Sequence, residues 1–202
     1  MTPKLEQLTT QFTELIGPEA FARAAAAAAQ PNPGPTVPAA APSTALSATP
    51  SAAPVTAPAA AKPSPAPAAP PPPLQVTSHA LKGWDLDARV SPLQVVAAAE
   101  LLDRAGFAID AVTGVDWLAQ DQMEVVYDFF HPIESLRVVV RTRVPRANSE
   151  VPTISAVFPG ANWHERETHD FFGIRFTGHP NLAPFLLPED ATFHPLRKDY
   201  TP

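Results

Sequence analysis

The chain has 202 residues, of which 27 are proline and none is cysteine, and its formal net charge is −6 at pH 7. Without cysteine, this chain alone cannot build a disulfide framework, a cysteine-ligated iron–sulfur cluster or a zinc ribbon. The acidic balance argues against a nucleic-acid partner, whose phosphates require a positive surface. No apolar run approaches the roughly 20 residues that cross a bilayer. We therefore expect a soluble, cytoplasmic protein without redox chemistry of its own.

Residues 1–30 are predicted to form an N-terminal helical segment. Within residues 4–16 the apolar side chains recur at helical spacing and form one stripe, which consists of Leu5, Leu8, Phe12, Leu15 and Ile16. Gly17-Pro18 interrupts this helix, and residues 19–29 can resume it as an alanine-rich helix. The stripe has two equally supported roles, which are docking on a partner protein and packing against the chain's own domain.

Residues 31–73 hold 15 of the prolines and are otherwise mostly alanine, serine and threonine, with Lys62 as their only charged residue. Such a segment has almost nothing large to bury, so it cannot offset the entropy cost of ordering its backbone. We expect a disordered, partly polyproline linker. The remaining residues, 74–202, carry the whole net charge and have the usual size of a single domain.

The domain is predicted to contain a helix followed by a sheet. Ser91, Pro92 and Gln94 form a capping box that starts a helix, and Gly106 ends it after Ala105. A strand is expected over residues 107–112. Residues 123–130 and 136–144 alternate in polarity and are joined by a short turn, which predicts an antiparallel hairpin. Together with a later helix, this predicts a two-layer α+β domain of helices on a mainly antiparallel sheet, with an extended C-terminal tail.

Arginines line one face of the second hairpin strand, where Arg137, Arg141 and Arg143 alternate with apolar residues. A row of arginines suggests a phosphate or nucleic-acid site. However, Glu124 and Asp128 alternate onto one face of the preceding strand, from which they can pair with these arginines across the hairpin. We therefore expect a solvated, charge-paired sheet face.

The segment from Trp163 to Asp199 holds four of the six histidines at a high density of charge. Asn162 and Glu165 form a capping box that predicts a helix start, and Gly173 is placed to end that helix. His164 and His169 are five residues apart, which separates them by about 140° on a regular helix. Such a pair cannot chelate one metal ion in the way that an H-E-x-x-H motif does.

Within this helix, the pairs Arg166–Asp170, Glu165–His169 and Trp163–Glu167 have i,i+4 spacing. Exposed pairs are worth only about 0.3–0.5 kcal/mol, so stability is a weak reason for so much charge. A surface that contacts another protein, with Trp163, Phe171 and Phe172 as apolar anchors, is one interpretation. An ordinary solvated helix is the other. The tail after His194 has no periodicity, so it is either frayed or an arm that lies on a neighbour.

Two motifs carry a family resemblance. The run E-R-E-x-x-D-x-F-G-I-x-F-x-G-H-P covers Glu165 to Pro180, and H-P-L-R-K-D covers His194 to Asp199. Together they resemble the 30-kilodalton subunit of bacterial NADH:quinone oxidoreductase (respiratory complex I). Residues 111–116, which end in Asp116, and the aromatic residues Tyr127 and Phe129 agree, and the resemblance spans about residues 85–200.

The resemblance implies a structural subunit without catalytic residues or a cofactor of its own. It implies a place in the peripheral arm beside the quinone-site subunit and the terminal iron–sulfur subunit, with FMN and iron–sulfur clusters in partner subunits. The complex would hold the chain peripherally at the cytoplasmic face of the bacterial inner membrane. The residues expected to hold its shape and its contacts are Trp163, Glu165, Arg166, Glu167, Asp170, Gly173, Gly178, His179, Pro180, His194, Pro195, Leu196, Arg197, Lys198 and Asp199.

Two departures from the family pattern predict a changed turn or contact surface. Residues 183–185, Ala-Pro-Phe, replace residues that are usually basic, and Phe193 replaces a glycine whose positive φ phenylalanine disfavours. Three alternatives remain open. The chain could be the equivalent subunit of an energy-converting membrane-bound nickel–iron hydrogenase or formate-hydrogenlyase-type complex. It could be a metal hydrolase that uses His164, His169 and His179, or a proline-rich adaptor.

Overall fold

The computed structural model describes residues 2–17 and 72–201. The alanine-rich segment predicted at 19–29, and the predicted linker except for its last two residues, lie outside the described residues. The helices are α1 (Pro3–Ile16), α3 (His79–Lys82), α4 (Val95–Arg104) and α5 (Ala161–Phe172), with 3-10 turns at Pro92–Gln94, Leu118–Gln120 and Arg146–Asn148. The strands are β1 (Leu74–Val76), β2 (Leu86–Arg89), β3 (Ala108–Trp117), β4 (Gln122–Phe130), β5 (Arg137–Pro145), β6 (Glu150–Pro152) and β7 (Arg175–Thr177).

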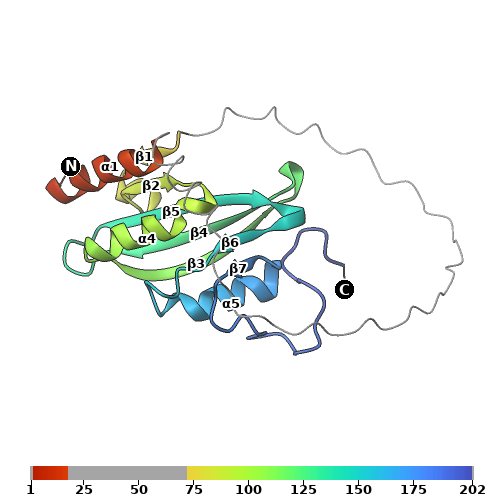
Figure 1. Cartoon of the computed structure of the whole chain (residues 1–202). Coiled ribbons are helices and arrows are strands. Elements are labelled where there is room, and N and C mark those ends of the chain that lie inside the picture. The colour runs from red at the N-terminus through yellow and green to blue at the C-terminus, as the bar shows by residue number, and fades with distance from the viewer. Residues whose placement is uncertain (1, 18–71, 202) are drawn as a thin grey trace, which may run out of the picture. The chain divides into compact units, whose positions relative to one another are not determined.

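Five strands form the main sheet in the order β1-β2-β5-β4-β3, and β6 pairs with β7 in a separate two-stranded sheet (Figure 1). In the main sheet every pairing is antiparallel except that of β2 with β5. The predicted hairpin is β4–β5, and the strand predicted at 107–112 is β3, which continues to Trp117. The predicted α+β class and its mainly antiparallel sheet are therefore confirmed.

The start and end of α4 follow the predicted signals. The Ser91 N–H donates to Gln94 Oε1 at 3.0 Å, and a single 3-10 turn leads into the helix. Gly106 follows the helix with φ at 84°, a left-handed conformation that glycine adopts without steric cost. None of the helices within residues 2–17 and 72–201 is long and apolar enough to span a membrane.

The core lies between the helices and the apolar face of the sheet. Alternate residues of β4 and β5, including Tyr127 and Val140, point into it, and α4 contributes Val95, Ala98, Ala99 and Leu102. Helix α1 belongs to the same core, because Leu5, Leu8 and Phe12 are buried in the same cluster. Of the two roles predicted for this stripe, the structure shows packing against the chain's own domain.

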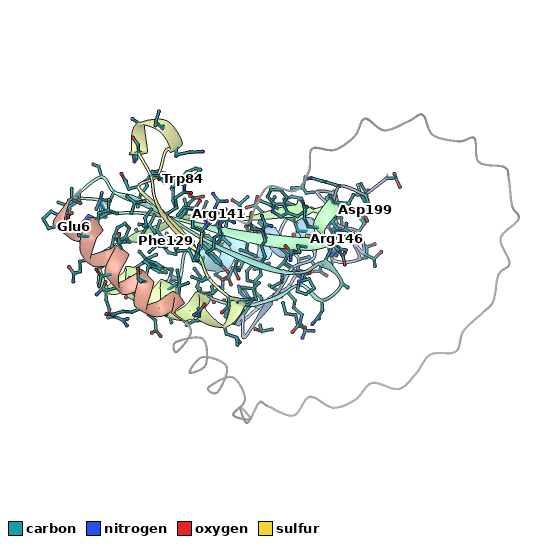
Figure 2. All side chains as sticks on the ribbon, turned by 90° about the horizontal axis from the view of Figure 1, so that it is seen from above. Glu6, Trp84, Phe129, Arg141, Arg146 and Asp199 are labelled. Atoms are coloured by element: carbon teal, nitrogen blue, oxygen red, sulfur yellow. The ribbon has the colours of Figure 1, made fainter. Side chains whose placement is uncertain are left out.

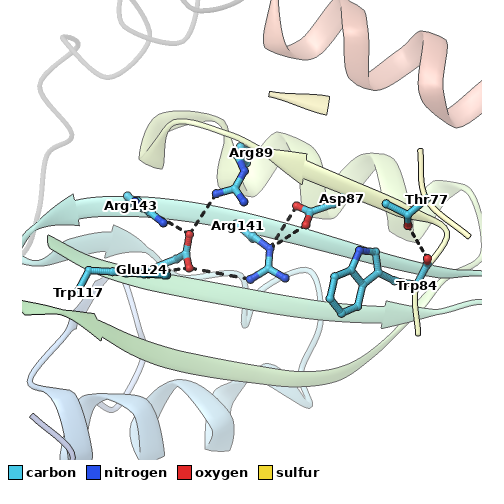
Figure 3. A network of polar contacts seen from close by, with 8 residues as sticks. All are labelled: Thr77, Trp84, Asp87, Arg89, Trp117, Glu124, Arg141 and Arg143. Carbon is cyan, nitrogen blue, oxygen red and sulfur yellow. Dashed lines mark hydrogen bonds and ion pairs between the residues drawn. The ribbon is translucent and has the colours of Figure 1, made fainter. Parts of the chain in front are cut away.

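The other face of the sheet carries the arginines and is charge-paired, as predicted, but the carboxylate at the centre of the network is buried (Figure 3). Glu124 is only 2 % exposed and lies opposite Arg143 in the hairpin. Arg143 Nε donates to Glu124 Oε1 at 2.9 Å, and the Trp117 indole donates to Oε2 at 3.0 Å. The sequence analysis expected these ion pairs to be solvated. Instead, arginine side chains and the Trp117 indole surround the Glu124 carboxylate.

The predicted pairing of Asp128 with the arginines is wrong. Asp128 lies opposite Val139 in the hairpin, and Arg137 pairs with Asp110 of β3 at 2.9 Å. Burial raises the pKa of the Asp128 carboxyl, against the opposing effect of Arg141 and Arg137. Arg141 in turn binds Asp87 of β2, with Nε 3.1 Å from Oδ2. The network depends on β2, a strand that the sequence analysis did not identify.

Candidate functional site

Helix α5, which carries the first family motif, starts at Ala161 after Gly160, so the predicted Asn162–Glu165 capping box is wrong. Asn162 is already inside the helix, and Glu165 is fully buried. The Glu165 carboxylate accepts hydrogen bonds from the Ile154 N–H at 2.8 Å and from the Thr153 hydroxyl. It therefore fastens the helix to the loop that precedes it, and it does not cap the helix terminus.

The environment of Glu165 favours its neutral form. Burial raises the pKa of this carboxyl to about 7, although both hydrogen bonds oppose the rise. The buried His179 side chain places Nε2 3.9 Å from Glu165 Oε2. The Asn181 N–H donates to His179 Nδ1 at 3.1 Å, so the ring proton sits on Nε2, which donates to Asn162 O at 3.2 Å. Burial also lowers the pKa of His179, consistent with a neutral ring.

Gly173 ends α5 as predicted, with φ at 72° and its N–H donating to His169 O at 2.8 Å. A second requirement for glycine comes from the tail, because a Cβ at this position would collide with Arg197 Nη2 and His194 Nε2. The absence of a side chain thus both permits the left-handed backbone and lets the second family motif approach the helix end.

The C-terminal tail, residues 178–200, supplies donors to the last carbonyls of α5, which have no partners within the helix. His194 Nδ1 donates to Asp170 O at 2.8 Å, the Leu196 N–H donates to Phe171 O at 3.1 Å, and Arg197 Nε donates to Phe172 O at 2.7 Å. The Arg197 cation is also favoured by the negative end of the helix dipole. The tail is therefore held on its own domain and is not frayed.

Asp170 and Arg166 hold an earlier part of the tail. Asp170 Oδ2 accepts from the backbone N–H groups of Phe185, Leu186 and Leu187 at 2.8, 2.7 and 3.2 Å. Burial alone would raise the pKa of this carboxyl, but the three donors outweigh that effect and lower the pKa.

Arg166 donates to Ala183 O and Pro184 O at 2.9 and 2.8 Å, and its guanidinium lies 4.9 Å from the centre of the Phe185 ring. Residues 183–185, for which the sequence analysis expected a changed contact surface, are thus the segment that Arg166 binds. The predicted i,i+4 ion pairs of α5 are wrong. Arg166 and Asp170 bind the tail backbone, and Glu165 binds the preceding loop.

Asp116, at the end of β3, fixes the last part of the tail. Its buried carboxylate accepts from Arg146 Nε at 3.1 Å and from the Lys198 N–H at 2.9 Å. Arg146 also binds Asp199, and the two lie side by side in Figure 2. Hydrogen bonds to Asp199 and Asp116 raise the pKa of Arg146, and the bond to Arg146 lowers that of Asp199. The sequence analysis missed Arg146, and only its position after the long hairpin strand could have drawn attention to it.

The other predicted site residues lie at the surface or in turns. Trp163 is 62 % exposed and Leu196 is 53 % exposed, so both remain candidates for contacts with another protein. Phe171 and Phe172, the other predicted anchors, are half-buried.

The remaining predicted site residues lie in turns or beside a cavity. Gly178 has φ at 80° and precedes His179 and Pro180. Pro195 is half-buried, and Glu167 lines a small cavity between α5 and β3.

A metal site is not supported within the described residues, where no group of three or more histidine, cysteine, aspartate or glutamate side chains is placed to hold an ion. His169 Nδ1 donates to Ile174 O at 2.9 Å, and both ring nitrogens of His179 are already hydrogen-bonded. Of the histidines proposed for a metal hydrolase, His169 and His179 thus serve internal contacts, and His164 lines a small cavity between α5 and β3.

Known proteins with similar sequences or folds point to one family. Residues 88–202 match the family described as the respiratory-chain NADH dehydrogenase, 30 Kd subunit. An NADH-quinone oxidoreductase subunit of Roseiflexus sp. (strain RS-1) is 42% identical over 121 residues, which cover 57% of this chain and 69% of the relative. The corresponding NADH-quinone oxidoreductase subunit of Moorella thermoacetica is 37% identical over 122 residues, which cover 59% and 82%.

A solved structure shares this fold. A chain from the membrane-bound sulfane sulfur reductase, an archaeal respiratory membrane complex, superposes with a TM-score of 0.54 at 27% identity, covering 57% of this chain and 71% of that chain. The fold, the two motifs and these matches agree, and the chain belongs to the 30-kilodalton subunit family of the respiratory-chain NADH dehydrogenase.

Proposed function

We propose that this chain is a non-catalytic structural subunit in the peripheral arm of an NADH:quinone oxidoreductase. It supports the quinone-reducing module during electron transfer from NADH to quinone, which is coupled to ion translocation. The observation that carries the proposal is that the motif side chains bind atoms of this chain's own backbone. Glu165, Arg166, Asp170 and Arg197 all bind backbone groups of this chain, as expected of residues that shape a subunit surface.

The exposed apolar side chains of the same region support a role in assembly. Trp163 on α5 and Phe185, Leu186 and Leu196 on the tail are large and exposed. Large apolar and aromatic side chains of this kind commonly anchor protein interfaces. We propose that they contact the quinone-site subunit and the terminal iron–sulfur subunit, which together with other partners carry the iron–sulfur clusters and FMN. The complex would then hold this chain at the cytoplasmic face of the bacterial inner membrane.

A second candidate follows from the structural neighbour. The sulfane sulfur reductase is named as a respiratory membrane complex with a different reaction, and one of its chains shares this fold. Subunits of this kind can therefore serve complexes that are not NADH dehydrogenases. We keep as the alternative the equivalent subunit of an energy-converting membrane-bound nickel–iron hydrogenase or formate-hydrogenlyase-type complex.

Affinity purification of this protein from detergent-solubilised membranes, with mass spectrometry of its partners, tests the proposal. Flavin- and NADH-binding subunits in the eluate are the expected result. A nickel–iron hydrogenase large subunit without them would favour the alternative. Recovery of the protein without any respiratory subunit would contradict both.

A matched pair of variants tests the proposed contact surface. Trp163→Ala removes an exposed aromatic side chain from α5, and we expect it to lower recovery of partner subunits without changing the melting temperature. Ile133→Ala is the control, because Ile133 is 87 % exposed but lies in the hairpin turn. Equal recovery for both variants would remove Trp163 from the interface.

A further inference from the structure

Helix α1 packs against α4, β1 and β2 (Figure 1), and the surface that these elements present to α1 is called the groove below. The buried residues Leu5, Leu8 and Phe12 follow i, i+3, i+7 spacing, and Phe12 is completely buried. This spacing is the one by which an amphipathic helix is recognised in an apolar groove. The contact therefore has the form of a helix bound to a receptor site.

The groove also recognises both ends of the helix. In the first turn of α1, Lys4 Nζ lies 3.0 Å from Glu134 Oε1 and 2.6 Å from His131 Nε2, both in the hairpin turn. At the other end, Gln94 Nε2 donates to Leu15 O at 2.7 Å. Leu15 O is one of the four terminal carbonyls that a helix cannot pair internally. These polar contacts fix the position and direction of α1 in the groove.

One side of α1 remains open. A cleft of about 680 Å³ lies along the contact between α1 and α4, and on the α1 side it is lined by polar residues such as Gln7, Gln11 and Glu14. In addition, α1 is joined to β1 only through residues 18–71, so no short connection holds it in place. Within residues 2–17 and 72–201, side-chain contacts are what hold this helix against the domain.

We propose that the groove formed by α4, β1, β2 and the hairpin turn is an amphipathic-helix binding site, with α1 of this chain as its exchangeable ligand. The ligand class is a helix with large apolar side chains at i, i+3 and i+7, a cation in its first turn and a free terminal carbonyl. The inference is independent of the proposed respiratory role, since it concerns contacts within one chain. It also explains how a helix remote in the sequence completes the core.

The test uses the full chain with a protease recognition sequence inserted between Thr44 and Ala45. After cleavage, a fluorescently labelled peptide of residues 2–17 is added, and its binding is followed by anisotropy. We expect saturable one-to-one binding to the cleaved protein. We expect much weaker binding to the uncut chain, because there the peptide competes with an α1 that belongs to the same molecule.

Unlabelled peptides then serve as competitors. The Phe12→Ala peptide should compete at least about 30-fold more weakly than the natural peptide, because it loses a large buried side chain. The Thr13→Ala peptide should compete within about twofold, since Thr13 is exposed and donates to Thr9 O within the helix. Equal competition by the two variants, failure of the cleaved protein to take up the peptide, or its unfolding on cleavage would overturn the proposal.

Discussion

Helix α4 and the C-terminal tail are ordered by different means. In α4, four apolar residues at helical spacing face the core, and the side chains of the opposite face are exposed. The tail, residues 178–200, has neither helix nor strand, and polar side chains of α5 and the sheet hold its backbone. The comparison teaches that a segment without periodicity can be fixed when polar side chains elsewhere satisfy its backbone groups.

The largest expected effect comes from removing core packing in α4. Leu102→Ala removes a completely buried side chain of α4, which should cost about 3 kcal/mol of unfolding free energy. The loss should be global, so the tail and the sheet should unfold in one transition. Urea unfolding followed by tryptophan fluorescence and circular dichroism measures this, with Leu81→Ala, at an 84 % exposed position, as the control. Different urea midpoints from fluorescence and from circular dichroism would show that parts of the domain unfold separately, which would contradict this prediction.

Glu165 of α5 makes the free energy of unfolding depend on pH. In the unfolded chain this carboxyl titrates near its ordinary pKa of 4.5, whereas burial raises its pKa in the fold to about 7. Between these values the unfolded state loses the proton first, so the free energy of unfolding falls as pH rises and levels off above about pH 7. The shift corresponds to about 3 kcal/mol.

Glu165→Gln tests this, because glutamine does not titrate but keeps an acceptor for the Ile154 N–H. Urea midpoints between pH 5 and 8.5 should fall for the natural protein and remain flatter for the variant, which should be the more stable of the two at alkaline pH. Parallel curves would show that Glu165 is ionised throughout.

Asp170→Ala should release the tail while leaving α4 in place. The substitution removes the acceptor of three backbone N–H groups, and the loss should be about 2 kcal/mol because the freed tail can bind water. Trypsin should then cleave after Arg197 and Lys198 faster than in the natural protein. Asp170→Asn keeps one acceptor and should show an intermediate rate. An unchanged rate for the alanine variant would mean that Asp170 does not hold the tail.

The smallest effect is expected at an exposed pair on α4. Glu100 and Arg104 have the i,i+4 spacing that the sequence analysis assigned to α5, with Oε2 and Nη1 3.7 Å apart. Glu100→Gln should change the unfolding free energy by less than about 0.5 kcal/mol. A larger loss in urea denaturation would show that the polar contacts of α4 resemble those of the tail.

The sequence predicted the elements whose signals are local. The capping box at Ser91 and Gln94 marked the start of α4, and alternating polarity marked the β4–β5 hairpin. Strands β1, β2, β6 and β7 were missed because each has only three or four residues. The alternation of Leu86, Ala88 and Val90, all buried, was the available signal for β2. Its parallel partner β5 lies about 50 residues away, beyond the reach of local patterns.

The motifs singled out Glu165, Arg166 and Asp170, but spacing alone assigned these residues wrong partners. Glu165 fits both a capping box and an exposed ion pair, and only the packing of α5 shows that its side chain is buried. Asp170 and Arg166 bind backbone atoms 15 to 18 residues further along the chain, and Asp116 binds a tail amide 82 residues away. Backbone partners leave no mark in the identity of the residues that provide them, so these contacts could not be predicted.

Amide hydrogen exchange of the tail tests the central claim, that α5 and the sheet hold residues 178–200 in place. The N–H groups of Phe185, Leu186 and Lys198 are bound by Asp170 and Asp116. We predict that they exchange slowly in the natural protein. In Asp170→Ala the amides of Phe185 and Leu186 should exchange at the rate of a free peptide, while those of α4 stay protected. Fast exchange of these tail amides in the natural protein would contradict the account.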